Sequence, residues 1–182
     1  LATAQTLAAG AQGVINLTIT VNRNGGAAVN FTNQANASAT TPAGQNVSVS
    51  DTAPATFHIP SVTITNQVTA LVPNGTNFSV TMRIDVQNSG DVTLTNVQAT
   101  DDLDSAFSGV QSFTITSKSA TGLSINTNYN GVSDINLLVG TNSLAVGATG
   151  SVFLTVSVVP DLGTSFQNQA AGQGTSTSPG GG

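Results

Sequence analysis

The loop at residues 126–134 has the side chains and spacing that most suggest a metal site in this sequence. Asn126, Asn128 and Asn130 occupy its first, third and fifth positions, followed by Gly131 at the sixth and Asp134 at the ninth. In calcium loops this spacing directs alternate oxygen ligands at one ion, and the glycine permits the tight turn. These side chains are therefore candidate calcium ligands.

The same loop departs from the calcium pattern at its end. Position twelve is Leu137, where calcium loops carry a bidentate acid, and three of the four side-chain ligands would be neutral amides. Calcium affinity rises with ligand charge, so a site here would be weak. The alternative is an Asn-rich turn whose amides bond the local backbone.

A second candidate cation site is the acidic cluster Asp101, Asp102 and Asp104, to which Asp85 or Asp91 could contribute. A divalent ion could bridge these carboxylates and stiffen a domain junction. The alternative is a solvated turn that discourages edge pairing. Paired carboxylates also perform acid–base chemistry in glycosidases, but a chain with no Trp and one Tyr does not predict an aromatic-lined cleft.

The remaining reactive residues do not form a recognisable reaction centre. His58 is the only histidine and there is no cysteine, so a transition-metal site is not expected. The sequence contains no nucleophile motif for a Ser-His-Asp triad. We expect His58 to pack at a domain junction and Lys118, in "TSKSATG", to lie in a turn. The sequence predicts no catalytic residue, no enzymatic activity and no cofactor beyond the possible calcium.

The composition predicts an all-β protein. Only 6% of the residues are charged, and no glutamate is present, whereas exposed helices are usually built from Glu, Lys, Arg and Ala. Asn, Thr, Ser and Gly fill the polar positions, and these residues favour strands and turns.

The charge balance excludes several partners. The net charge is −5, and the three cations are Arg23, Arg83 and Lys118. This number of cations cannot neutralise a nucleic-acid backbone or dock on anionic lipid. No apolar run approaches the roughly 18 residues of a membrane span.

One passage of the sequence occurs twice. "TLAAGAQGVINLTITV" (6–21) recurs as "SLAVGATGSVFLTVSV" (143–158), and "FTNQA" (31–35) recurs as "FQNQA" (166–170). The apolar phase is kept between the copies. Ile15, Leu17, Ile19 and Val21 correspond to Val152, Leu154, Val156 and Val158.

The repeat predicts the domain organisation. Residues 1–44 would be the last strands, at 13–22 and 29–40, of a preceding repeat that is incomplete in this chain. Residues 45–57 would be a Pro-containing connector and 58–177 a full β-sandwich of about seven strands. Residues 178–182 would be a Gly-rich connector or tail.

Within 58–177 the strand signal is strong. Five apolar residues alternate with polar ones: Phe78, Val80, Met82, Ile84 and Val86. After the turn "NSGD" the alternation slips by one residue, which predicts a β-bulge near Asn96. Further strands are expected at 62–71, 110–117, 152–159 and 165–173, with Asn-Gly turns at 24–25, 74–75 and 130–131. The pattern predicts an antiparallel β-sandwich.

Three segments resemble a known repeat: "MRIDVQNSGDVTLTNVQATDDLDSAF", "NYNGVSDINLLVGTNSLAVGATG" and "FQNQA". The sequence resembles the conserved-repeat domain of bacterial and archaeal surface proteins, the family labelled domain of unknown function eleven. The resemblance covers nearly the whole chain. It implies an immunoglobulin-like or prealbumin-like sandwich in large secreted or wall-anchored proteins, with no catalytic activity.

The expected function is structural. The chain would be a repeat unit of an extracellular or cell-surface fibre, filament, stalk or sheath, with neighbouring repeats or identical subunits of a homopolymer as its partners. The missing strands would come from upstream in the same polypeptide or, by donor-strand complementation, from a neighbouring subunit. The alternative is an adhesive module that binds a glycan or protein.

Overall fold

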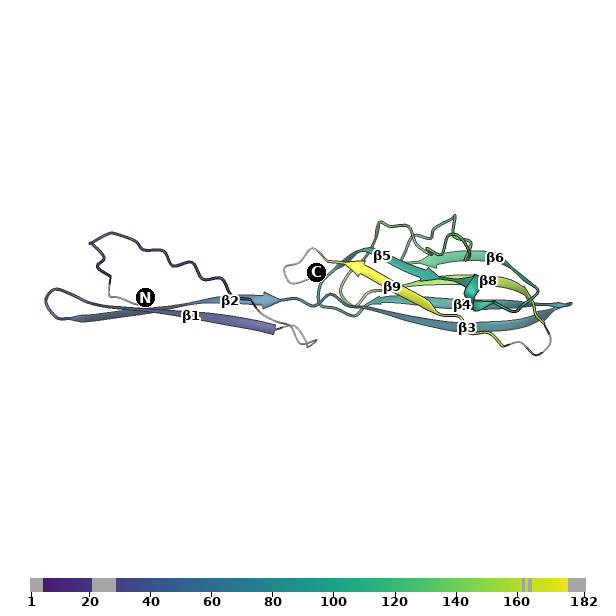
Figure 1. The fold of residues 1–182 in the computed structure, drawn as a ribbon, viewed down its shortest axis with the longest axis horizontal. Coiled ribbons are helices and arrows are strands. Elements are labelled where there is room, and N and C mark those ends of the chain that lie inside the picture. The colour runs from purple at the N-terminus through teal and green to yellow at the C-terminus, as the bar shows by residue number, and fades with distance from the viewer. Residues whose placement is uncertain (1–4, 21–28, 162, 164, 177–182) are drawn as a thin grey trace.

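The computed structural model describes residues 5–20, 29–161, 163 and 165–176, and within them the protein is all-β (Figure 1). The strands are β1 (Val29–Thr40), β2 (Asn46–Phe57), β3 (Val62–Asn74), β4 (Asn77–Asn88), β5 (Leu94–Asp101), β6 (Ser112–Thr121), β7 (Asn142–Leu144), β8 (Thr149–Val159) and β9 (Ala170–Thr175). A four-residue helix, α1 (Leu103–Ala106), follows β5. None of the described helical segments is long and apolar enough to cross a membrane.

Seven of these strands build a sandwich. One antiparallel sheet has the order β3-β4-β8-β6 and the other the order β7-β5-β9. The described residues contain nine strands in all, the seven of the sandwich and the two of the hairpin β1–β2, which precedes the sandwich and projects from one end of it (Figure 1).

The core lies between the two sheets and is lined by the apolar side chains of the central strands. Alternate residues of β4 and β8 are buried, which confirms the predicted phase of both strands. The fully or almost fully buried residues of these strands are Val80, Met82, Ile84, Val86, Val152, Leu154, Val156 and Val158.

The predicted β-bulge is present at Asn96. This residue has a φ of +50°, in the left-handed region. The pairing of β5 with each of its two neighbours, β7 and β9, shifts in register at this point. The extra residue restores the phase, so that Val97 and Ala99 are buried alongside Leu94.

The predicted turns and strand ends agree with the structure in part. Gly75, with a φ of +65°, forms the tight turn between β3 and β4. Gly131 also has a positive φ, but it lies in the long loop between β6 and β7. The Asn24-Gly25 turn and the tail at 178–182 fall outside the described residues. Lys118 lies in β6 rather than in a turn, because the Ser- and Thr-rich segment around it pairs with β8.

The expected connector at 45–57 is a β-strand over almost its whole length. β2 pairs with β1 along twelve residues, and Pro54 lies opposite Thr32. Proline is tolerated there because β2 is an edge strand. The division of the chain into repeats remains a prediction. The segment expected to connect them is an extended strand that pairs with β1.

The β1–β2 hairpin is amphipathic. In the register of this hairpin, odd-numbered residues of both strands share one face and even-numbered residues the other. The odd face includes Phe31, Ala35, Ala37, Ala39, Val47, Val49, Ala53, Ala55 and Phe57. The rings of Phe31 and Phe57 meet edge to face with their centroids 5.2 Å apart. Most of this apolar face is exposed, with Val49 at 68%.

The strand predicted at 13–22 is not formed in its described part. Residues 13–20 have no assigned strand and are exposed throughout. Leu17 is 73% exposed, whereas its counterpart Leu154 is completely buried. The sequence pattern of a core strand is therefore present without the sheet that a core strand needs.

The entry from β2 into the sandwich is fixed by the turn after β4. The Asp91 carboxylate accepts a bond from the Ile59 N–H at 2.6 Å, and its other oxygen lies 3.3 Å from Nδ1 of His58. The Ile59 carbonyl in turn accepts from the Asp91 N–H, and the Ser61 carbonyl accepts from Gly90. The Ile59 bond is the main reason that the pKa of Asp91 is lowered. His58 thus lies where the chain enters the sandwich, and a domain junction at this point stays a prediction.

Gly90 provides the test of this junction. A Cβ at Gly90 would overlap the Ile59 carbonyl oxygen and the Ser61 nitrogen, which are backbone atoms and cannot swing aside. We expect Gly90→Ala to lower the free energy of unfolding by about 1–3 kcal/mol, as overpacking does. Gly140→Ala is the matched control, because a Cβ there meets nothing within 4 Å; it should change stability by less than about 0.5 kcal/mol. Equal effects in urea unfolding would contradict a tight junction.

Candidate functional site

The β6–β7 loop is organised by the amide side chains that the sequence marked as calcium candidates. Oδ1 of Asn130 accepts hydrogen bonds from the backbone N–H groups of Val132, Ser133 and Asp134, each at 3.0 Å. Oδ1 of Asn126 accepts from the Asn128 N–H at 3.0 Å. The side-chain oxygens therefore bond the loop's own backbone, as in an Asx turn.

Asp134 closes the loop. One carboxylate oxygen accepts from Nδ2 of Asn126 at 2.9 Å and the other from the Asn136 N–H at 3.1 Å. The Asn126 bond is the largest cause of the lowered pKa of Asp134. This network is the one expected of an Asn-rich turn, and calcium binding here stays a prediction.

The acidic cluster is not brought together. Asp102 accepts from the Ser105 N–H and caps the N-terminus of α1, whereas Asp104 is exposed and Asp101 is buried. Asp85 is bound to Arg83 at 2.8 Å, and Asp91 belongs to the junction. Across the described part of the chain, no three acidic, histidine or cysteine side chains are grouped to hold a metal ion.

Asp101 is instead paired with an amide. One carboxylate oxygen accepts from Nδ2 of Asn168 at 3.0 Å. Its other oxygen and Oδ1 of Asn168 are both buried acceptors without a donor. Burial is the main reason that the pKa of Asp101 is raised to about 6. Protonation of Asp101 removes its buried charge and gives its carboxyl group a donor.

The sign of the resulting pH dependence follows from the raised pKa. Since the folded pKa exceeds the unfolded one, the contribution of Asp101 to stability is full below pH 4 and is lost as the pH rises through 6. This loss amounts to roughly 3 kcal/mol by pH 7. Asp101→Asn replaces the charge by an amide with its own donor, so we expect it to stabilise the protein at pH 7 and to remove this loss.

The measurement is urea unfolding at several pH values between 4 and 7. The exposed Asp104→Asn is the matched control for the loss of one carboxylate. If the wild-type protein and the Asp101→Asn variant changed in stability by the same amount across this range, the loss of stability would not come from Asp101.

Lys118 ties the loop to the edge of the sandwich. From β6, its Nζ donates to the backbone carbonyls of Thr127 (2.6 Å) and Tyr129 and lies 5.8 Å from the centre of the Tyr129 ring. Tyr129 is buried and donates from its hydroxyl to the Asp101 carbonyl at 3.2 Å. Desolvation of this hydroxyl raises the pKa of Tyr129.

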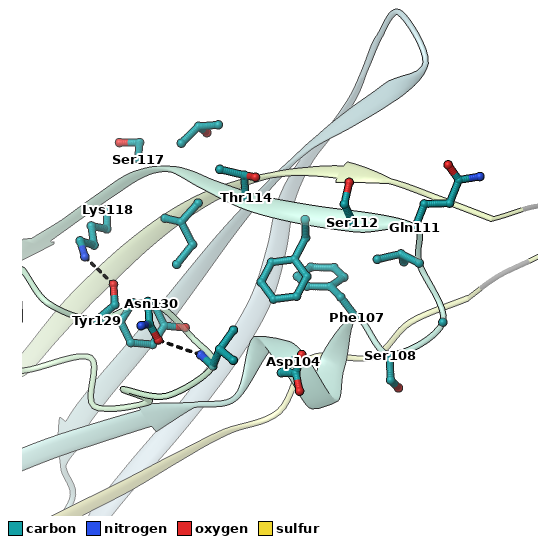
Figure 2. A pocket seen from close by; sticks show the side chains of 16 residues that line it. Asp104, Phe107, Ser108, Gln111, Ser112, Thr114, Ser117, Lys118, Tyr129 and Asn130 are labelled. Atoms are coloured by element: carbon teal, nitrogen blue, oxygen red, sulfur yellow. Dashed lines mark hydrogen bonds between the residues drawn. The ribbon is translucent and has the colours of Figure 1, made fainter.

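A groove of about 890 Å³ runs along the β6 edge between that strand, α1 and the loop residues 129–132 (Figure 2). Its floor includes Phe107 and Phe113, whose ring centroids are 5.4 Å apart. The titratable groups that line it are Asp104, Lys118 and Tyr129. Sequence analysis missed this groove because the loop that forms one wall has no periodic pattern.

The groove does not supply the exposed aromatic cluster that an adhesive module needs. Phe107 is only 2% exposed, and its ring also packs on Phe166 at 4.8 Å. Phe107 is therefore part of the core, Phe113 and Phe166 are partly buried against it, and adhesion by this segment stays a prediction.

Comparison of the chain with protein-family models, with curated proteins and with solved structures gave no match. The resemblance to the conserved-repeat family of surface proteins thus stays an expectation from the sequence, and the function has to be argued from the chain itself.

Proposed function

We propose that the chain is a structural segment of an extracellular or cell-surface filament, stalk or sheath, built from repeats of the sandwich at 58–177. One observation carries the proposal. The same passage is a central strand with a completely buried apolar face in one copy, β8, whereas residues 13–20 of the other copy are exposed and form no strand. The proposal explains the exposed copy as part of a sandwich completed by residues outside this chain.

The energetic argument rests on three side chains. Ile15, Leu17 and Ile19 are each about 70–75% exposed, and full burial of such a side chain stabilises a protein by roughly 2 kcal/mol. The backbone of the segment also lacks the ladder bonds that β8 makes with β4 and β6. The exposed apolar side chains and the missing ladder bonds both favour docking of this segment in a sandwich.

The hairpin supports the same conclusion. Residues 35–40 of β1 correspond to β9, whose inward face is built of small residues and packs over β3, with Gly172 beside Ile64 and Val62. Within the described residues no sheet lies over the equivalent face of β1, and two strands alone are marginally stable in water. The missing cover would therefore have the chemistry of the sheet β3-β4-β8-β6.

The internal repeat offers a matched pair of substitutions. Leu154→Ala should lower the free energy of unfolding of the sandwich by about 2–5 kcal/mol, because it leaves a cavity in a closed core. Leu17→Ala should change the stability of the isolated chain by less than about 0.5 kcal/mol, yet weaken assembly of the native polymer. Assembly that is insensitive to Leu17→Ala would contradict the proposal.

The intact denatured mass of the native polypeptide distinguishes the two forms of the proposal. A mass far above 18.1 kDa is expected of a covalent tandem array with the missing strands upstream. A mass near this value, together with a non-covalent polymer, is expected of strand exchange between subunits. A native polypeptide of this mass that stays monomeric would contradict both forms.

A further inference from the structure

The segment 46–61 contacts the hairpin strand β1 with its first part and the following sandwich with its last part. Through the register from Val29↔Phe57 to Thr40↔Asn46 it is paired with β1, the counterpart of the last strand of a sandwich. Directly after β2, residues 58–61 are bonded to the turn at 89–91 of the following sandwich. The segment 46–61 is therefore hydrogen-bonded to β1 along its first part and to the turn at 89–91 at its end.

The last strand of the complete sandwich presents the corresponding edge. β9 pairs with β5 on one side and ends the sheet β7-β5-β9 within the described residues. Its counterpart in β1, residues 35–40, is the stretch to which residues 46–51 of β2 are bonded. β1 is thus paired with β2, whereas β9 is paired with β5 and has no strand on its other edge within the described residues.

We propose that the outer edge of β9 is the docking site for a strand with the sequence of β2, supplied by the next repeat. This inference rests on the proposed function. It adds that consecutive repeats share a sheet, in which the strand leading into one sandwich completes the sheet of the sandwich before it.

The side chains of the two strands are complementary in size. Along β1, Val47 and Val49 lie opposite Ala39 and Ala37. β9 has small residues on the same face: Gly172 lies beside Ile64 and Val62 of the opposite sheet, and Gly174 lies beside Leu94 and Val97 of β5. The valines of a docked strand would fill space that these glycines leave.

The polar faces also agree. Ser48 and Ser50 of β2 would share the outer face with Gln173 of β9. The one charge within 46–51 and 170–175 is Asp51, which lies on the apolar face at the end of the paired stretch, opposite Ala35 in the hairpin. Cross-strand contacts between β-branched and small residues, together with the main-chain bonds, provide the affinity of such strand addition.

A shared strand has a mechanical consequence. A flexible linker allows neighbouring domains to reorient, whereas a strand paired in one sandwich and bonded to the turn at 89–91 of the next fixes their spacing and direction. It also covers the exposed sheet edge of β9, which otherwise invites unspecific association.

The experiment appends a copy of residues 45–57 after Gly182 of the full chain and measures hydrogen exchange of residues 170–175. Covalent attachment gives the appended strand a high effective concentration. We expect the outward-pointing amides of β9 to exchange at least about tenfold more slowly than in the parent chain.

Two variants of the appended copy are the matched controls. Val47→Lys with Val49→Lys places charges on the face that meets the sandwich and should abolish the protection. Ser48→Lys with Ser50→Lys places them on the outer face and should retain it. Unchanged exchange in β9, protection that survives both pairs of substitutions, or protection at the edges of β3 or β6 instead would each overturn the inference.

These outcomes are separate from those that test the proposed function. The appended strand reports on β9 alone, whereas the proposed function depends on whether residues 13–20 are buried in the native polymer. If the appended strand did not slow exchange in β9 but residues 13–20 were buried in the native polymer, the repeat array would stand and the shared strand would be rejected.

Discussion

The sandwich depends on one constraint, which is that the apolar face of β8 must be covered and both of its edges paired. In the complete copy, β4 and β6 provide the edges and the opposite sheet provides the cover, so that Val152, Leu154 and Val156 have no exposed surface. The other copy has the same residue types but none of these neighbours. The same local sequence is thus a core strand or an exposed segment according to what surrounds it.

Uncharged amide side chains carry much of the polar interior. Asn88 donates to the carbonyls of Val92 and Leu144, and Gln98 bonds both the N–H and the C=O of Leu138 in the manner of a neighbouring strand. An amide supplies donors and an acceptor without the cost of burying a charge. A chain with few charged residues can therefore satisfy its loops internally, and Asp101 is the buried exception.

The alternation and the bulge could be predicted from the sequence because both depend on the period of two along a strand. The strand character of 45–57 could not, because Pro54 suggests a linker unless its place on an edge strand is known. Residues 13–20 have the alternating pattern of a core strand, but the described residues contain no strand that pairs with them. The burial of Tyr129 and the place of Lys118 depend on how the loop at 122–141 folds back over the sheets, which no local pattern reports.

The central claim is that residues 13–20 occupy, in the native assembly, the place that β8 occupies in the complete sandwich. Hydrogen exchange of the protein in its native assembled form tests this most directly, with amides 13–20 compared with amides 152–158. The account predicts that both segments exchange slowly, at rates set by opening of a closed sandwich. Fast exchange at 13–20 beside slow exchange at 152–158 would contradict it.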